Sequence, residues 1–262
     1  MATDATASTH TTGGTARVWR AGMLVIGDEI LSGRTQDRNV ATLARWLGAQ
    51  GIRLAEVRIV PDDMDAIGAA LTALMTAHDY VFTTGGIGPT HDDITVDAVA
   101  AALGVPVVMH PRAEAILRDY YGERITPARL RMARVPQGAD LIENPRSGAP
   151  GVRLGNLFLM AGVPAIMQAM LDALEGRLEG GAPLVSAAVG AWVPESEVAE
   201  LLGSLQKAHP DIAIGSYPFW REGRIGANFV LRGVDAQAVA ALSCKLRAEL
   251  EKAGIDSVDH EL

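Results

Sequence analysis

Short apolar runs alternate with amphipathic stretches along the chain from Val18 onward. Met23–Ile26 and Tyr80–Thr84 are nearly continuous apolar runs, which is typical of strands covered on both faces. Between them, apolar residues recur at i, i+3, i+4 and i+7, the spacing of one helix face: Val40, Leu43, Ala44 and Leu47. This strand–helix–strand order predicts an α/β fold with a mostly parallel sheet.

The same reading predicts the other elements of a first domain. In chain order they are a strand Arg53–Val60, a helix begun by Pro61-Asp62-Asp63, a helix Thr95–Leu103, a short strand Val105–Met109, two further helices of which the second opens with Thr126-Pro127, a hairpin Val152–Leu154 and Leu157–Met160 around Gly155-Asn156, and a helix Ala165–Leu178. The alternation of strands and helices places this domain at residues 17–180.

A second, smaller domain is predicted after the linker Gly180–Pro183. Its elements are a strand Leu184–Val193, a helix Glu195–Ala208, strands Ile212–Tyr217 and Arg224–Leu231, and a helix Ala236–Ala253. This βαββα order predicts a small α+β domain at residues 184–255. Residues 1–16 are rich in Thr and Ala and lack the basic and apolar regions of a secretory signal, so they are interpreted as a disordered tail.

Composition and charge narrow the classes of function. The 262 residues carry a net charge of −8, which argues against a nucleic-acid partner, although a small phosphorylated ligand needs only a local electropositive pocket. The single cysteine, Cys244, cannot form an internal disulfide, and no Cys/His cluster has zinc-ligand spacing. No apolar run approaches the roughly 20 residues of a membrane helix. A cytoplasmic protein without a membrane partner is expected.

The segment Thr83–Thr95 contains the strongest candidate site. Gly85, Gly86 and Gly88 lie between a predicted strand and a predicted helix, where free backbone N–H groups and the helix N-terminus attract anions. Glycine permits positive φ and lets a phosphate approach closely. Phosphate binding is therefore assigned to these glycines and their neighbours Thr84, Pro89 and Thr90.

Two adjacent carboxylates follow this glycine loop. Asp92 and Asp93 would repel a bare phosphate, so they indicate a divalent cation that bridges to it. One of the two has an equally good alternative role as a helix cap. His91 is either a third metal ligand or, as is commoner, an exposed loop histidine.

A second acidic pair, Asp28-Glu29, follows Gly27 at the end of the first strand. Ligands of open α/β sheets bind outside the carboxyl ends of the strands, so this pair and the glycine loop are expected to face one crevice. A solvated loop is the alternative for this pair. Asn39, which opens the next helix, either caps it or reaches the ligand.

The polar loop Asn144–Gly151 is a third candidate, with Ser147, Gly148 and Pro150 as ligand-binding positions. Arg146 either supplies positive charge to a phosphate or is an ordinary surface arginine. By contrast, Gly223-Arg224-Ile225-Gly226 matches the GXXG of RNA-binding domains but lies between two predicted strands, so it is interpreted as a hairpin turn.

Several of these segments resemble one known family. They are Gly27–Gly33 with Asn39, Thr83–Thr95, Asn144 with Ala149–Gly151, Ala161–Pro164 and Ile214–Pro218. Together they resemble the molybdopterin-binding (MoaB/Mog, molybdenum-cofactor biosynthesis) domain superfamily, and within it the competence/damage-inducible protein A (CinA) group. The resemblance covers about residues 18–178 and extends through the last segment into the second domain.

The resemblance implies a three-layer α/β/α fold and a homo-oligomer, either a dimer or a trimer. Biosynthetic members bind molybdopterin and adenylylate it, and Asp93 stands at the position of their functional aspartate. Competence-type members are linked to metal-dependent hydrolysis of ADP-ribose-like pyrophosphates. Asp92 stands where adenylylating members tend to have a basic residue, which favours hydrolysis. Many relatives continue into a nicotinamide-nucleotide deamidase domain, which is not expected for this chain, since it ends at Leu262.

The sequence therefore predicts a metal-dependent pyrophosphatase acting on a nucleotide or pterin phosphate. Mg²⁺ or a similar ion is expected to be held by Asp92, Asp93 and Asp28, with Glu29 as a further catalytic carboxylate. Molybdopterin adenylylation and a non-catalytic pterin- or nucleotide-binding module are the alternatives.

Overall fold

The computed structural model describes residues 17–221 and 223–262. The tail predicted at residues 1–16 lies outside the described residues. The chain divides into two compact units, one running through Gly181 and one from Ala182 to Leu262 that also groups with Gly48–Gly51.

The first unit is built on a six-stranded sheet of order β2-β1-β3-β8-β7-β6. Its strands are β1 (Trp19–Ile26), β2 (Ile52–Val60), β3 (Tyr80–Thr84), β6 (Asp140–Ile142), β7 (Gly151–Leu154) and β8 (Leu157–Met160). The pairs β1–β2, β1–β3 and β3–β8 are parallel, whereas β7 and β6 add an antiparallel edge. The prediction of a mostly parallel sheet is confirmed.

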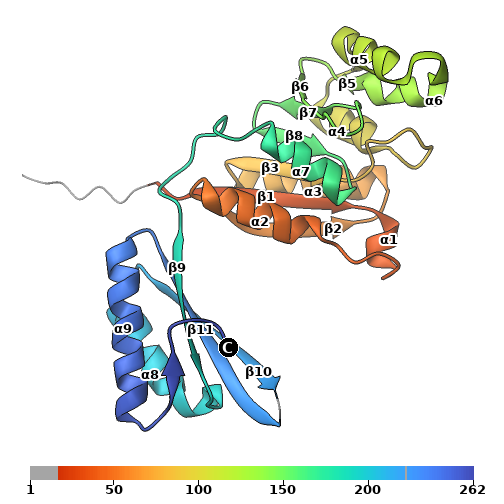
Figure 1. Cartoon of the computed structure of the whole chain (residues 1–262). Helices are drawn as coiled ribbons and strands as arrows, with labels where there is room; N and C mark the ends of the chain where they lie inside the picture. Colours follow the sequence, from red (N-terminus) through yellow and green to blue (C-terminus); the bar gives the residue numbers. More distant parts are fainter. Residues whose placement is uncertain (1–16, 222) are drawn as a thin grey trace, which may run out of the picture. The chain divides into compact units, whose positions relative to one another are not determined.

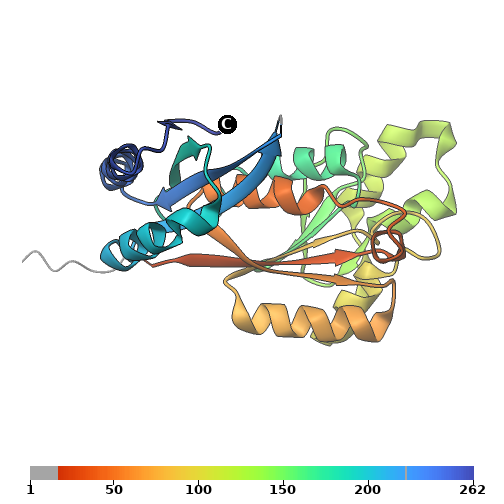
Figure 2. The same cartoon turned by 90° about the horizontal axis from the view of Figure 1, so that it is seen from below.

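Helices cover both faces of this sheet. α2 (Asn39–Ala49) and α7 (Pro164–Asp172) pack on one face, and α3 (Met64–Ala77) and α4 (Thr95–Leu103) on the other. The other helices of this unit are α1 (Asp28–Leu31), α5 (Pro111–Tyr121) and α6 (Pro127–Leu130), with 3-10 turns η1 (Gly122–Arg124) and η2 (Arg131–Ala133). Figure 1 gives their order along the chain, and Figure 2 shows α2 and α3 on opposite faces of the sheet. The predicted three-layer α/β/α arrangement is present.

Alternate residues of the central strands contribute their side chains to two separate hydrophobic cores, one on each face of the sheet. On one face Met23, Phe82 and Phe158 pack against α2 and α7, and the rings of Phe82 and Phe158 stack 4.8 Å apart. On the other face Leu24 and Val81 pack against α3 and α4. Because both faces are buried, the strands are nearly continuous apolar runs, as the sequence indicated.

Several boundaries in this unit differ from the prediction. Asp28 and Glu29 open the short helix α1 rather than an irregular loop. The helix predicted to reach Leu178 ends at Asp172, and the buried Leu174 continues its apolar pattern in the turns that follow. The strand predicted from Val105 begins only at Val107, because Pro106 has no N–H to donate to a neighbouring strand. This strand, β4 (Val107–Met109), pairs with β5 (Arg134–Pro136) outside the main sheet.

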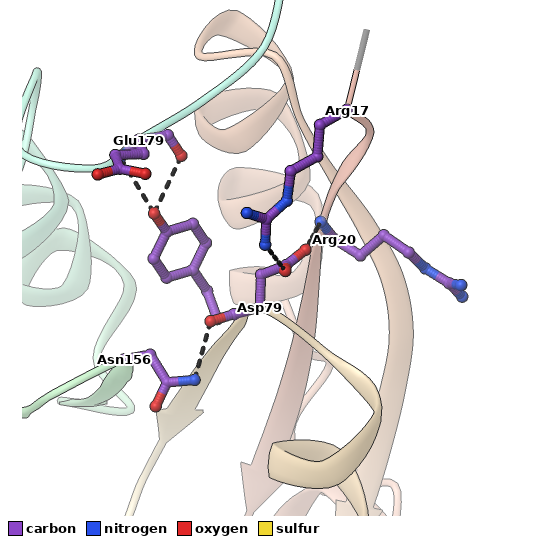
Figure 3. Close-up of polar contacts among 6 residues, drawn as sticks. Arg17, Arg20, Asp79, Asn156 and Glu179 are labelled. Atoms are coloured by element: carbon purple, nitrogen blue, oxygen red, sulfur yellow. Dashed lines mark hydrogen bonds and ion pairs between the residues drawn. The ribbon is translucent and has the colours of Figure 1, made fainter. Parts of the chain in front are cut away.

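Polar contacts link the amino ends of β1 and β3 to each other and to the segments beside them (Figure 3). The Asp79 carboxylate accepts hydrogen bonds from the Arg17 guanidinium at 2.6 Å and the Arg20 N–H at 2.8 Å. The side-chain amide of Asn156 donates to the Asp79 carbonyl at 2.8 Å. Tyr80 donates its hydroxyl proton to the Glu179 carbonyl at 3.0 Å. The hydrogen bond from Arg20 and the pairing with Arg17 hold the pKa of Asp79 below its ordinary value.

The second unit is an antiparallel sheet of order β10-β11-β9-β12 with two helices on one face. Its elements are β9 (Val185–Ala191), α8 (Glu195–Ala208), β10 (Ala213–Arg221), β11 (Arg224–Gly233), α9 (Ala236–Lys252) and β12 (Ser257–Val258). The GXXG match begins at the turn between β10 and β11, so its interpretation as a hairpin is confirmed. β12 was not predicted from the sequence.

Candidate functional site

The glycine loop leaves β3 in a tight backbone arrangement. Gly85 has φ +97° and Gly86 has φ +66°, and a Cβ on Gly85 would lie 2.1 Å from the carbonyl oxygen of Ile26, the last residue of β1. The hydroxyl of the buried Thr95 donates to the Gly85 carbonyl at 2.9 Å, and its N–H donates to the Gly86 carbonyl at 3.0 Å. These contacts fix the loop against the ends of two strands and the start of α4.

The Asp93 carboxylate folds back into the same loop. One oxygen accepts the Gly88 N–H and the other the Thr90 N–H, both at 2.7 Å, and the Thr90 hydroxyl donates to the second oxygen as well. Gly88 does not have the positive φ that was expected; glycine is required there because a Cβ would lie 2.6 Å from the Asp93 carboxylate. Asp93 therefore closes the loop and does not cap α4.

Only part of the loop backbone is left for a ligand. The Gly85 N–H donates to the Met160 carbonyl at 3.2 Å, so the N–H groups of Gly85 and Gly88 are both engaged, contrary to the expectation that they hold phosphate. The N–H groups of Gly86 and Ile87 form no hydrogen bond within residues 17–221 and 223–262. Those two amides are the donors that the loop offers to an anion.

A pocket opens on the side of the loop that faces α4 and η2. It is lined by Gly86, Ile87, Gly88, Asp93, Val96, Asp97, Arg131, Met132, Arg134, Pro150 and Val152. Arg134 forms a bidentate pair with Asp97, at 2.5 and 3.2 Å. Four of the predicted site residues, Gly86, Gly88, Asp93 and Pro150, come together there, and two arginines that the sequence analysis did not select join them.

The acidic residues at the strand ends form a second group. Asp62, just after β2, accepts a hydrogen bond from the Asp28 N–H at 3.1 Å. Burial raises the pKa of Asp62 above its ordinary value, and the negative charges of Asp28, Glu29 and Asp92 raise it further, against the effect of that hydrogen bond. Asp28, Glu29 and Asp92 thus act electrostatically on one carboxylate, whereas Asp93, the other member of the second predicted pair, is turned into its own loop.

This acidic group is open to solvent. Asp28, Glu29 and Asp92 are exposed, and the neighbouring Thr90 side chain lowers the pKa of the Asp92 carboxyl. His91, considered as a third ligand, has a side chain that is 98% exposed and lies 3.9 Å from Asp92. Within the described ranges no three His, Cys, Asp or Glu side chains are close enough together to hold a metal ion by themselves.

Asn39, the first residue of α2, is linked to the glycine loop through Gly162. Its side-chain amide donates to the Gly162 carbonyl at 2.7 Å, and Gly162 packs against the backbone of Gly85. Asp37, not Asn39, accepts the N–H of Val40 in the first turn of the helix. The side-chain oxygens of the buried Asn39 and Thr84 have no hydrogen-bond partner in the part of the chain that the structure describes. Unpaired buried oxygens are costly, so both are candidate acceptors for a ligand donor.

The remaining predicted positions shape the backbone around the crevice. The buried Gly27 donates its N–H to the Val60 carbonyl at 3.1 Å. Asn144 folds its own loop by donating to Ser147 Oγ and to the Ala149 carbonyl, each at 2.7 Å. Gly148 has φ +71° and lies against the Tyr120 ring. The side chain of Pro89 makes no hydrogen bond, and Arg146 is exposed, as its surface interpretation expected.

Two kinds of residue were missed. Asp62 follows a predicted strand, so the same strand-end rule that selected Asp28 would have found it. Arg131 and Arg134 lie on η2 and β5, roughly forty residues beyond the loop, and no spacing in the sequence relates them to it.

The fold and these residues define an α/β protein with a glycine-rich loop and acidic residues at the carboxyl edge of its sheet. The chain belongs to the molybdopterin-binding domain family, whose model, described as "probable molybdopterin binding domain", matches residues 22–179. Residues 183–259 match a second model, described as "FAD synthase, middle domain".

Individual relatives agree with this assignment. A protein of Aeropyrum pernix is 35% identical in an alignment of 257 positions that covers 90% of this chain and 95% of the relative. A CinA-like protein of Desulfosudis oleivorans is 37% identical over 74% of this chain. The match spans 51% of that relative, so the chain covers about half the length of such CinA-like proteins.

A solved structure supports the same fold. The crystal structure of CinA from Thermoplasma acidophilum, a protein of unknown function, is 36% identical with a TM-score of 0.58 and covers 61% of this chain and 98% of that one. Among the described residues, none of the helices is both long and apolar enough to span a bilayer.

Proposed function

We propose that the chain binds a phosphorylated nucleotide or pterin at the carboxyl edge of its sheet and hydrolyses a pyrophosphate bond in it with the help of a divalent metal. The observation that supports this is the acidic group beside the glycine loop. Asp62, Asp28 with Glu29, and Asp92 follow β2, β1 and β3, three neighbouring strands, and the other charges act on the pKa of Asp62. Uncompensated carboxylates next to anion-binding amides suit a cation shared with a phosphate.

The residues present fit such a shared cation better than an all-protein cage. Mg²⁺ is usually held by one or two carboxylates together with phosphate oxygens and water, so three converging protein ligands are not required. Asp28 and Asp92 are the proposed metal ligands, with Glu29 or Asp62 close by. When bound, the metal would neutralise phosphate charge and lower the pKa of the attacking water.

The chain's own groups position the ligand. We propose that the N–H groups of Gly86 and Ile87 donate to a phosphate oxygen, because they are free to do so. Asp93 holds these amides in place through Gly88 and Thr90, so its proposed role is to position the loop. For ADP-ribose the reaction adds one water across a phosphorus–oxygen bond and gives AMP and ribose 5-phosphate.

Purified protein incubated with Mg²⁺, Mn²⁺ or Co²⁺ tests this proposal. We expect ADP-ribose or FAD to be cleaved to the two monophosphates, and Asp92→Asn to lower the rate at least about tenfold. Asp119→Asn is the matched control, since Asp119 is an exposed aspartate on α5 with no hydrogen bond or ion pair among the described residues. Intact substrates with all three metals would contradict the proposal.

Molybdopterin adenylylation is the second candidate, favoured by the description of the matching family model. In that reaction the pterin phosphate attacks the α-phosphorus of ATP, and pyrophosphate leaves. Formation of adenylylated molybdopterin from ATP would support it. Saturable binding of nucleotide or pterin without turnover, unchanged in Asp92→Asn, would instead favour a binding module.

A further inference from the structure

We infer that Arg131 binds a phosphate of the ligand in the pocket between the glycine loop and η2. This inference rests on the proposed function and deepens it, because it names the residue that selects for phosphate and the class of ligand it selects.

Of the two arginines that line this pocket, one is already neutralised. Arg134 is held in a bidentate pair by Asp97. Arg131 is only partly exposed, and its guanidinium has no ion pair, hydrogen bond or aromatic partner among residues 17–221 and 223–262. A guanidinium presents a rigid fork of N–H donors that matches phosphate oxygens. Arg131 therefore has a full set of donors available where Arg134 does not.

The glycine loop brings further donors to the same pocket. Gly86 and Ile87 line it, and both have unengaged N–H groups. The negative charge of Asp93, which also lines the pocket, is offset by hydrogen bonds from Gly88 and from Thr90. An anion placed between Arg131 and the loop amides would thus meet donors from two sides.

Such a pocket favours a particular class of ligand. A phosphate oxygen can satisfy a guanidinium and backbone amides together, whereas a neutral nucleoside or pterin ring cannot. The acidic group is reached through Asp92, five residues beyond Ile87 in the same loop. On this assignment one phosphorus of a pyrophosphate binds at Arg131, and the other carries the oxygens that it shares with the metal. We therefore assign to Arg131 the discrimination between a pyrophosphate diester and its dephosphorylated parts.

Titration calorimetry on the full chain tests this assignment. ADP-ribose and inorganic pyrophosphate serve as phosphate-bearing probes and adenosine as the phosphate-free probe, each measured with Mg²⁺ and with EDTA. We expect Arg131→Met to weaken the binding of both phosphate probes by about 10- to 100-fold, the range for lost charged hydrogen bonds. Affinity for adenosine should stay unchanged. Arg131→Lys should retain part of the affinity.

Arg118→Met is the matched control. Arg118 is an exposed arginine on α5 whose pair with Glu114 is solvent-screened, and its loss should leave all three affinities unchanged. Equal circular dichroism spectra and melting temperatures would establish that Arg131→Met is folded.

The outcomes separate this inference from the proposed function. If Arg131→Met binds pyrophosphate and ADP-ribose as the wild type does, or if the wild type binds neither, the inference is wrong. If the wild type binds both through Arg131 but leaves ADP-ribose intact with every metal, the inference stands and the proposed hydrolysis fails. Equal weakening of adenosine and ADP-ribose would also overturn it, since the loss would not be specific to phosphate.

Discussion

Replacing Gly85 by alanine is the sharpest perturbation of the glycine loop. An added Cβ would lie 2.1 Å from the backbone oxygen of Ile26, in a residue whose φ is +97°. The obstructing atom belongs to a central strand and cannot rotate away. We therefore expect Gly85→Ala both to destabilise the first unit and to push the loop away from the end of β1.

The magnitude follows from two separate costs. A positive φ costs an alanine about 1–2 kcal/mol. Forcing an extra methyl into packed structure typically adds about 1–3 kcal/mol. Gly33 offers a control for the first cost alone, because it has φ +71° and nothing lies within 4 Å of its added Cβ. Gly33→Ala should therefore cost about 1–2 kcal/mol and Gly85→Ala about 2–5 kcal/mol.

Urea-dependent hydrogen exchange, read by mass spectrometry on peptides from β1 and β3, gives the free energy of unfolding of this unit separately from the rest of the chain. Binding of ADP-ribose by Gly85→Ala should weaken, while Gly33→Ala should bind as the wild type does. If the two variants lose the same free energy, within about 0.5 kcal/mol, the close approach to Ile26 has no energetic consequence and the reasoning is refuted.

Three further predictions concern charged groups. Asp79→Asn should destabilise the first unit at neutral pH, and the difference from wild type should shrink as pH falls through the depressed pKa of Asp79, because that stabilisation needs the ionised carboxylate; urea titrations across pH measure it. Asp62→Asn should raise the melting temperature at neutral pH, because a carboxyl with a raised pKa opposes folding when it is ionised. The same variant should lower ADP-ribose hydrolysis, because Asp62 belongs to the acidic group proposed to lie beside the metal. Arg134→Leu should cost about 1–2 kcal/mol in urea unfolding, as its pair with Asp97 is bidentate but about one-third exposed.

Each of these has a result that would count against it. For Asp79→Asn it is a destabilisation that does not vary with pH. A melting temperature lowered in Asp62→Asn would mean that the carboxylate stabilises the native state after all. For Arg134→Leu, the double mutant with Asp97→Ala should be no less stable than the single variant; an additive loss would show that the two side chains act independently.

The strands of the main sheet could be located from the sequence because each is marked by a local run of apolar residues. Strands buried on both faces need continuous apolar runs, and these mark β1, β3 and β8 in the sequence. The end of α7 could not be placed in this way, because the buried Leu174 keeps the helical apolar spacing after the helix has stopped. Periodicity reports burial, and it does not report the backbone hydrogen bonds that end a helix.

The candidate site was predictable only in part, for a similar reason. The rule that ligands bind at strand ends identified Gly85, Asp28 and Asp92 from residues next to predicted strands. Which N–H groups of the loop are free depends on Asp93 turning back towards Gly88, a three-dimensional contact. Arg131 reaches the loop from a separate helical segment, and only the tertiary fold brings it there.

The contacts around Asp79 have a consequence for how this domain is combined with others. Arg17, just before β1, and Glu179, where the family match ends, are both hydrogen-bonded near the amino ends of β1 and β3. The chain therefore enters and leaves the domain at one end of the sheet, while the glycine loop lies at the other. Domain boundaries of this kind tolerate the addition of further domains, and relatives about twice as long as this chain occur.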